Sequence, residues 1–228
     1  AGAAAVNLER VAKRLPADFV AASCLPRIAQ FTNSESWQMR RAAQFALSLI
    51  AEGCADEIFP ALDQVIPHVL ERVSDPHPRV RYATLHSLGQ LVTDFADEEA
   101  KEEGEPGFSE RFGAAIIEKV HAALVENVAF PRVLAVALGT LSRLCKTGRC
   151  APEVAAPYAA QLNETLLEIL RASTTVFVKE QAITVLGPLA VLCAEQFLPF
   201  YPAASQEMKS LLFDGTSFSN EDISVLRG

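Results

Sequence analysis

The chain has 228 residues, half of them hydrophobic, and a formal net charge of −8 at pH 7. That length suffices for one large domain or for a stack of small units, and the acidic balance argues against free nucleic acid as a ligand. No apolar run reaches the roughly 18 residues that a transmembrane span needs, so no membrane partner is expected.

Hydrophobic residues recur at intervals of three to four along most of the chain, which is typical of amphipathic helices. The start lacks the charged-then-apolar order of a signal peptide and resembles a helix cut open, which indicates a piece of a longer protein. Residues 3–15 are predicted to be the second helix of an incomplete unit. Four pairs of a first and a second helix follow: 16–30 with 37–52, 56–74 with 78–95, 109–126 with 131–146, and 152–172 with 175–195. Residues 196–213 open a fifth unit, and Pro67, Pro157, Pro199 and Pro202 are expected to bend the first helices.

The run from Asp75 to Leu91, D-P-H-P-R-V-R-Y-A-T-L-H-S-L-G-Q-L, shows most clearly how two helices of a unit meet. Asp75 suits a helix N-terminus, and Pro78 fits a first helical turn because its missing N–H costs nothing there. Gly89 falls mid-helix, where it should cost about 1 kcal/mol relative to Ala. It therefore predicts the close approach of a neighbouring helix.

A repeat emerges when the dipeptides at 39–40, 80–81, 133–134 and 178–179 are aligned, with spacings of 41, 53 and 45 residues. An insertion of 12 residues, 96–107, explains the longest spacing, and the segment 94–105 holds seven acidic residues and one Lys. A period in the low forties with two helices per unit is typical of HEAT repeats. We therefore predict an all-α fold, a right-handed superhelical HEAT solenoid of about four helix pairs with partial units at both ends. Residues 1–228 form one array in this prediction, and 96–107 is a solvated acidic loop.

Arg40, Arg81 and Lys179 recur at one place in the repeat. We expect each to reach an acid on a neighbouring repeat, such as Asp75, and to tie the stack; binding of an acidic ligand is the alternative. Trp37, the only Trp, begins a second helix, where packing is favoured over ligand stacking.

Glu52 and Asp94 lie one residue apart in repeat register, each at the far end of a second helix. Second helices line the inner surface of a right-handed solenoid, so both carboxylates could pair with successive lysines of an extended peptide. The alternative is that they only solvate helix ends. One exposed pair contributes only about 0.2–1 kcal/mol, so recognition would need several pairs together with backbone contacts.

Motifs of catalysis and of cofactor binding do not occur in the chain. There is no phosphate-binding Gly-Lys-Ser loop and no His-Glu-x-x-His, and the four histidines are scattered. The five cysteines have no framework spacing, which favours reduced thiols. We expect no catalytic residues, no metal and no cofactor, and hence not an enzyme.

The motif D-P-H-P-R-V-R-Y-A at 75–83, with L-G-Q at 88–90 and T-D-F at 93–95, resembles the central repeats of the importin-β (karyopherin) superfamily. A-L-S at 46–48, A-E-G-C at 51–54, E-Q-A-I-T at 180–184 and S-V-L-R-G at 224–228 agree in order. The resemblance implies a segment of a nuclear transport receptor that carries basic cargo, including ribosomal proteins and histones, between cytoplasm and nucleus. It implies Ran-GTP and Phe-Gly nucleoporins as partners of the full-length protein.

Glu52 and Asp94 match acidic positions of that family's inner surface. The family's A-L-x-N-F is replaced by T-L-S-R-L at 140–144, so Arg143 brings a cation that would repel a Lys-rich peptide. The candidate cargo-binding residues are therefore Glu52, Asp94, Trp37 and Arg143. Periodicity alone does not separate a transport receptor from a HEAT scaffold that organises a multi-protein complex, such as a phosphatase; the resemblance favours the receptor. The exposed ends of such a segment are expected to self-associate.

Overall fold

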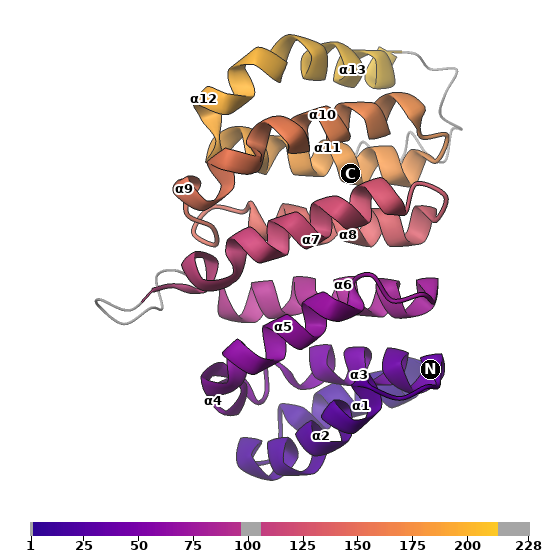
Figure 1. The fold of residues 1–228 in the computed structure, drawn as a ribbon, viewed down its shortest axis with the longest axis vertical. Helices are drawn as coiled ribbons and strands as arrows, with labels where there is room; N and C mark the ends of the chain where they lie inside the picture. Colours follow the sequence, from indigo (N-terminus) through magenta and orange to yellow (C-terminus); the bar gives the residue numbers. More distant parts are fainter. Residues whose placement is uncertain (1, 97–105, 214–228) are drawn as a thin grey trace.

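The computed structural model describes residues 2–96 and 106–213, which form successive helix pairs stacked along one axis (Figure 1). The first helices of the pairs are α2 (Ala17–Thr32), α5 (Leu62–Arg72), α7 (Ala114–Glu126), α10 (Ala159–Ala172) and α13 (Tyr201–Phe213). The second helices are α1 (Gly2–Ala12), α3 (Trp37–Ile50), α6 (Pro78–Phe95), α8 (Pro131–Leu144) and α11 (Val176–Leu192). No strand occurs within these ranges, so the predicted all-α stack of helix pairs is confirmed.

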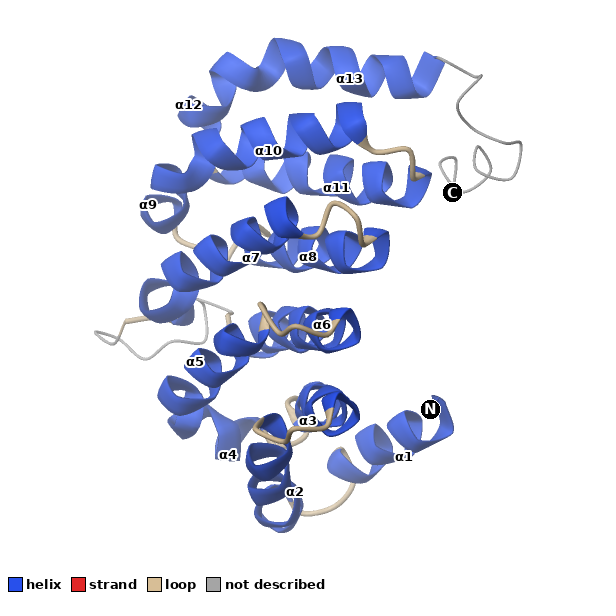
Figure 2. Ribbon diagram, turned by 45° about the vertical axis from the view of Figure 1, so that its right-hand side comes forward, coloured by secondary structure: helices blue, strands red, loops and turns tan. Residues whose placement is uncertain are grey.

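The helices form two layers, which we call the first-helix layer and the second-helix layer (Figure 2). In the second-helix layer, α1, α3, α6, α8 and α11 follow one another, and each packs on the next along much of its length. Neighbouring first helices touch far less extensively. Because one layer is packed more closely than the other, the stack curves with the second-helix layer on its inner side.

Three of the first helices begin with a break centred on a proline. The short helices α4 (Ala55–Ile58), α9 (Pro152–Ala155) and α12 (Ala194–Phe197) lead into 3₁₀ turns η1 (Phe59–Ala61), η4 (Ala156–Tyr158) and η5 (Leu198–Phe200). Pro60, Pro157 and Pro199 occupy these turns, where the backbone tightens before the long helix starts. Pro67 lies inside a first helix, α5, as predicted, and Pro202 lies in the first turn of α13. The break in the second pair falls at Pro60, a proline that the sequence analysis did not single out. Of the other two first helices, α7 follows a π-helical turn, η3 (Ser109–Gly113), and α2 has no preceding short helix.

Gly89 confirms the predicted close approach of two second helices. A Cβ at this position of α6 would lie 3.1 Å from Thr140 Oγ1 on α8. The Thr140 hydroxyl lies 2.8 Å from the carbonyl oxygen of Leu85 on α6 and 2.9 Å from that of Val136 on its own helix, so its one proton is shared between a bond across the two helices and a bond within α8. The small glycine thus allows α6 and α8 to pack closely.

The core is a continuous cluster of mostly aliphatic side chains with a few phenylalanines, and the five cysteines are free thiols. Within the described ranges, no helix is both long and apolar enough to cross a membrane. Residues 97–105, most of the predicted acidic insertion, lie outside the described residues, as do 214–228.

Candidate peptide-binding surface

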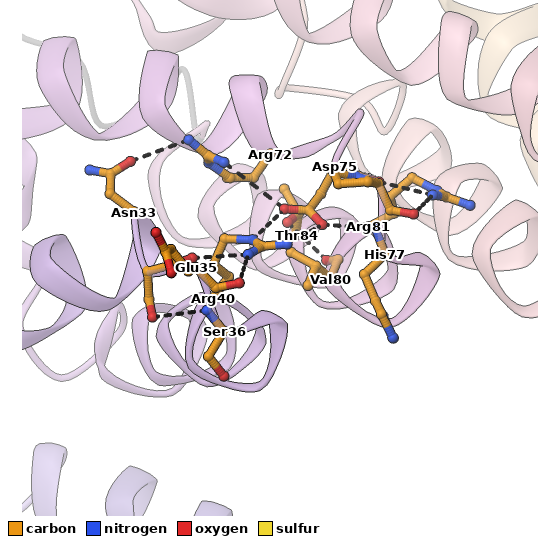
Figure 3. A network of polar contacts seen from close by, with 12 residues as sticks. Asn33, Glu35, Ser36, Arg40, Arg72, Asp75, His77, Val80, Arg81 and Thr84 are labelled. Atoms are coloured by element: carbon orange, nitrogen blue, oxygen red, sulfur yellow. Dashed lines mark hydrogen bonds and ion pairs between the residues drawn. The ribbon is translucent and has the colours of Figure 1, made fainter.

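The Asp75 carboxylate anchors the junction between the first two complete pairs (Figure 3). Its side chain is fully buried, and it accepts hydrogen bonds from Arg40 Nε at 2.7 Å and Arg40 Nη2 at 3.0 Å. The backbone N–H of His77 donates to the same carboxylate at 2.9 Å. Burial alone would raise the pKa of Asp75, but these bonds and the charges of Arg40 and Arg72 hold the pKa below its usual range. The structure thus brings the two predicted stacking residues together as a buried ion pair.

Arg81 repeats this arrangement one unit later. Its Nη1 donates to the carbonyl oxygens of Asp75 at 2.9 Å and Pro76 at 3.2 Å, just as Arg40 Nη1 donates to the turn before its own helix. Its Nε donates to Asn127 Oδ1 at 2.8 Å, and its guanidinium lies over the Phe130 ring. Arg81 therefore reaches an amide where Arg40 reaches an acid, and the sequence reasoning missed Asn127.

The series does not continue to Lys179. Leu134 takes the place of the arginine on α8 and is buried, so it offers no charge. The Lys179 side chain forms no hydrogen bond or ion pair with the part of the chain that the structure describes; only its backbone N–H donates, to the carbonyl oxygen of Thr175. Arg40, Arg81 and Asp75 thus lie in one polar series, and Lys179 stands outside it.

Trp37 lies at the opposite end of α3 from Glu52. Its ring stacks on His77 with centroids 3.9 Å apart and planes within 5°, and the Arg79 guanidinium lies 5.5 Å from its ring centroid. At about 1.5 Å per residue, the helix separates Trp37 from Glu52 by about 20 Å. The two candidate cargo residues therefore do not belong to one cluster, and the contacts of Trp37 are those of packing between repeats.

Glu52 follows α3 in an exposed turn. Its Oε2 lies 2.8 Å from Lys13 Nζ, and 61% of its side chain remains accessible to solvent. The hydrogen bond with Glu52, together with one to Glu9, raises the pKa of Lys13. Gly53 allows this contact, because a Cβ there would lie 2.4 Å from the carbonyl oxygen of Ala12. Glu52 is thus a surface carboxylate held near α1.

Asp94 lies in the last turn of α6 and is half-buried. Gln90 Nε2 donates to Oδ1 at 2.7 Å, whereas Oδ2 is shielded from solvent and has no hydrogen-bond partner among the described residues. Burial raises the pKa of Asp94 and the charge of Glu52 raises it further, against the opposing effects of Gln90, Lys13 and Arg143. Glu52 and Asp94 are thus electrostatic neighbours on the second-helix layer, and Asp94 carries a charge that its surroundings compensate only in part.

Arg143 crosses from α8 to α6. A Cβ on Gly89 would lie 3.4 Å from its Nη1, and the side chain is exposed. It borders a hollow of about 490 Å³ that we call the basic pocket, lined by Gln90, Thr93, Ser142, Arg143, Lys146, Arg149, Thr184 and Pro188. The sequence reasoning found Arg143 and missed Lys146 and Arg149, although Lys146 falls at the register of Glu52 and Asp94.

The candidate surface can bind a ligand through charged groups and hydrogen bonds. No group of His, Cys, Asp and Glu in the described ranges is arranged to hold a metal ion. His86 and His121 are both half-buried, and burial is the main cause that lowers the pKa of each, which favours the neutral ring. Such a surface suits the binding of a charged polypeptide.

Comparison with known proteins finds relatives among the importins. Residues 37–91 match the HEAT-like repeat family. Importin subunit beta-3 of Saccharomyces cerevisiae is 31% identical over 97% of this chain and 19% of the relative. Human importin-4 is 27% identical over 91% of this chain and 18% of its own length.

Solved structures of Kap121p give the same result. The complex of Kap121p with Nup53p superposes with a TM-score of 0.79 at 28% identity, over 92% of this chain and 19% of that one. The complex with Pho4p gives a TM-score of 0.77 at 30% identity, over 90% and 19%. The complex of Kap121p with RanGTP gives a TM-score of 0.73 at 28% identity, over 92% of this chain and 19% of that one. The chain spans about a fifth of the length of these relatives.

Proposed function

The chain belongs to the importin-β superfamily as a segment of its HEAT repeats, and from this premise we propose that it is part of a nuclear transport receptor. In this proposal the second-helix layer holds a Lys-rich segment of a cargo protein. The receptor's other partners, RanGTP and Phe-Gly nucleoporins, engage the full-length protein, which shuttles between cytoplasm and nucleus. Basic proteins such as histones and ribosomal proteins are the cargo class that fits an acidic surface.

The observation that carries the proposal is the state of Asp94. A half-buried carboxylate with one unpaired oxygen and a raised pKa is costly to the fold, and costs of this kind concentrate at binding sites. A lysine ammonium placed beside the carboxylate would supply the missing positive charge, and it could donate to Oδ2 once the side chain turns this shielded oxygen toward the surface. The carboxylate would then be stabilised in its charged form.

Glu52 extends the acidic surface by one repeat. Its present partner, Lys13, holds it in an exposed ion pair, which is worth at most about 1 kcal/mol. A second cargo lysine can share or displace Lys13 at little cost. Two successive lysines of an extended peptide would thus meet Glu52 and Asp94, with the rest of the affinity supplied by backbone contacts.

The test is titration of a fluorescent Lys-rich peptide into the chain at low and at physiological salt. We expect binding that weakens with salt, and a double variant, Glu52→Gln with Asp94→Asn, that loses about 1–2 kcal/mol of binding free energy. The matched control is Glu164→Gln with Glu168→Gln, which makes the same change in net charge on exposed acids of α10 in the first-helix layer.

Equal loss in both double variants would mean that the peptide responds only to net charge, and the proposed site would be wrong. Retention of full affinity in the Glu52/Asp94 variant would place cargo elsewhere. Circular dichroism of each variant shows whether the helices remain intact.

A further inference from the structure

The acidic surface ends abruptly at the third complete repeat. The acidic position comes 12 or 13 residues after the stacking arginine of its repeat, as Glu52 follows Arg40 and Asp94 follows Arg81. On α8 the arginine's place is taken by Leu134, and 12 residues later stands Lys146. The same place in three successive repeats thus carries negative, negative and then positive charge.

Two more cations join Lys146. Arg143 and Arg149 line the same hollow of about 490 Å³, the basic pocket, between the ends of α6, α8 and α11. Arg143 and Lys146 are exposed and Arg149 is half-buried. None of the three forms an ion pair with a carboxylate of the described ranges. Of the three, only Arg143 has an electrostatic interaction with an acid of the described part of the chain, a longer-range one with Asp94.

The other polar groups that line the hollow are uncharged: Thr93, Ser142, Thr184 and Gln90. The three hydroxyls donate to backbone carbonyl oxygens and Gln90 Nε2 donates to Asp94, so the donors that face a ligand are chiefly the three cations. No carboxylate is among the lining residues. Guanidinium and ammonium groups form the charge-assisted hydrogen bonds that carboxylates accept.

The basic pocket adjoins the acidic surface. Arg143 reaches across Gly89 of α6, five residues before Asp94, and its charge lowers the pKa that Asp94 would otherwise have. A ligand that runs along the second-helix layer therefore meets acid on α3 and α6 and then base on α8. A uniformly basic peptide fits only the first part of this path.

We propose that the basic pocket binds an acidic segment of the same cargo whose lysines contact Glu52 and Asp94. The proposal rests on the proposed function and specifies the cargo: a peptide in which lysines are followed or preceded, a few residues away, by Asp or Glu. Packed helices lie about 8–10 Å apart, and an extended peptide advances about 3.3–3.6 Å per residue. The acidic residue therefore lies about three residues from the lysine on Asp94. Nucleic acid does not fit, because its phosphates would run onto Glu52 and Asp94.

The experiment compares three fluorescent peptides of equal length that share one Lys-rich core. The first peptide carries Gln at the third and fourth residues beyond the core on both sides. The second replaces the two N-terminal Gln residues by Glu, and the third replaces the two C-terminal ones. We expect one Glu peptide to bind the chain about three- to ten-fold more tightly than the Gln peptide at low salt. The gain should vanish in the triple variant Arg143→Gln, Lys146→Gln, Arg149→Gln. It should persist in the control Arg27→Gln, Lys119→Gln, Lys209→Gln, which removes three exposed cations from first helices.

A single charge reversal keeps the test decisive if the triple variant unfolds. Lys146→Glu continues the acidic series onto α8, so it should bind the Gln peptide more tightly than the native chain does and disfavour the Glu peptide. Provided that the Lys-rich core still binds, any of three results would overturn the proposal. Neither Glu peptide binds more tightly than the Gln peptide, the gain in affinity persists in the triple variant, or the gain is lost equally in the control variant. If the core itself does not bind, the proposed function fails and this proposal fails with it.

Discussion

Removal of the Asp75 side chain should loosen the junction between repeats. Asp75→Ala deletes a fully buried carboxylate and leaves Arg40, only 11% exposed, without its acid partner. Breaking one side of a buried ion pair costs about 3–5 kcal/mol. Arg40 keeps its bonds to the carbonyl oxygens of Ser34 and Glu35, so we expect the lower end, about 3 kcal/mol.

Asn127→Ala is the matched comparison. It deletes a neutral acceptor that Arg81 contacts through Nε alone, where Arg40 contacts Asp75 through two nitrogens, and a hydrogen bond to a charged group contributes about 1.5–3 kcal/mol. Arg81 keeps its contact with the Phe130 ring, which reduces the loss to about 2 kcal/mol. Asp75→Ala should therefore be the more damaging change.

Urea unfolding followed by Trp37 fluorescence measures both changes. Trp37 is the only Trp and stacks on His77, two residues from Asp75, so its emission reports this junction. A local probe is needed because repeat arrays can unfold in parts. The pKa of Asp75 is lowered in the folded state, so its contribution is present at neutral pH and is lost as pH falls below about 4. A change below about 1 kcal/mol at pH 7, or one that persists unchanged at pH 3, would refute the reasoning.

Four further results are expected. Gly53→Ala should displace α1 and lower the thermal midpoint of unfolding, because the new Cβ would meet the Ala12 backbone. Gly187→Ala, which has open space on α11, should stabilise the fold by up to about 1 kcal/mol. Amide exchange should be faster in α1 of the first variant and unchanged there in the second. Asp94→Asn should raise the free energy of unfolding at pH 7, since the raised pKa means that the folded state disfavours the charged carboxylate; urea unfolding showing a loss would contradict this. Affinity for a Lys-rich peptide should fall as the pH drops through the raised pKa of Asp94, because the carboxylate then loses its charge. The fall should begin at a higher pH than an ordinary aspartate would give, and it should be absent when Asp94→Asn is titrated in the same way. Thr140→Val should cost about 1 kcal/mol in urea unfolding by removing the bond to Leu85, and a neutral result would mean that this bond does not hold α6 to α8.

The repeat period and the helix pairs follow from the sequence because apolar spacing and turn residues are local signals. The second helix 78–95 has the predicted bounds, since Pro78 fixes its first turn and the apolar spacing continues to Phe95. The breaks in the first helices were harder to place. Pro67 and Pro60 both lie in the second pair, and only the turn that the tertiary packing requires decides which of them interrupts the helix.

The site was predictable only where one residue type recurs. Glu52 and Asp94 share a register, and the structure places them as electrostatic neighbours. Asn127 was not predicted because an amide stands where an acid was expected. Its position is nevertheless similar: Asn127 lies six residues before Val133, and Asp75 lies five residues before Val80. Lys146 was not predicted because the register positions were compared for a repeated negative charge. At Lys146 the same position carries a positive charge.

The most direct test of the central claim is where a Lys-rich peptide lies on the chain. A peptide that carries a photo-cross-linker beside its central lysine, bound at low salt and mapped by mass spectrometry, should attach to the ends of α3, α6 and α8 around Asp94. Attachment to α5, α7 or α10 in the first-helix layer would contradict the account, because cargo would then bind on the outer side of the stack.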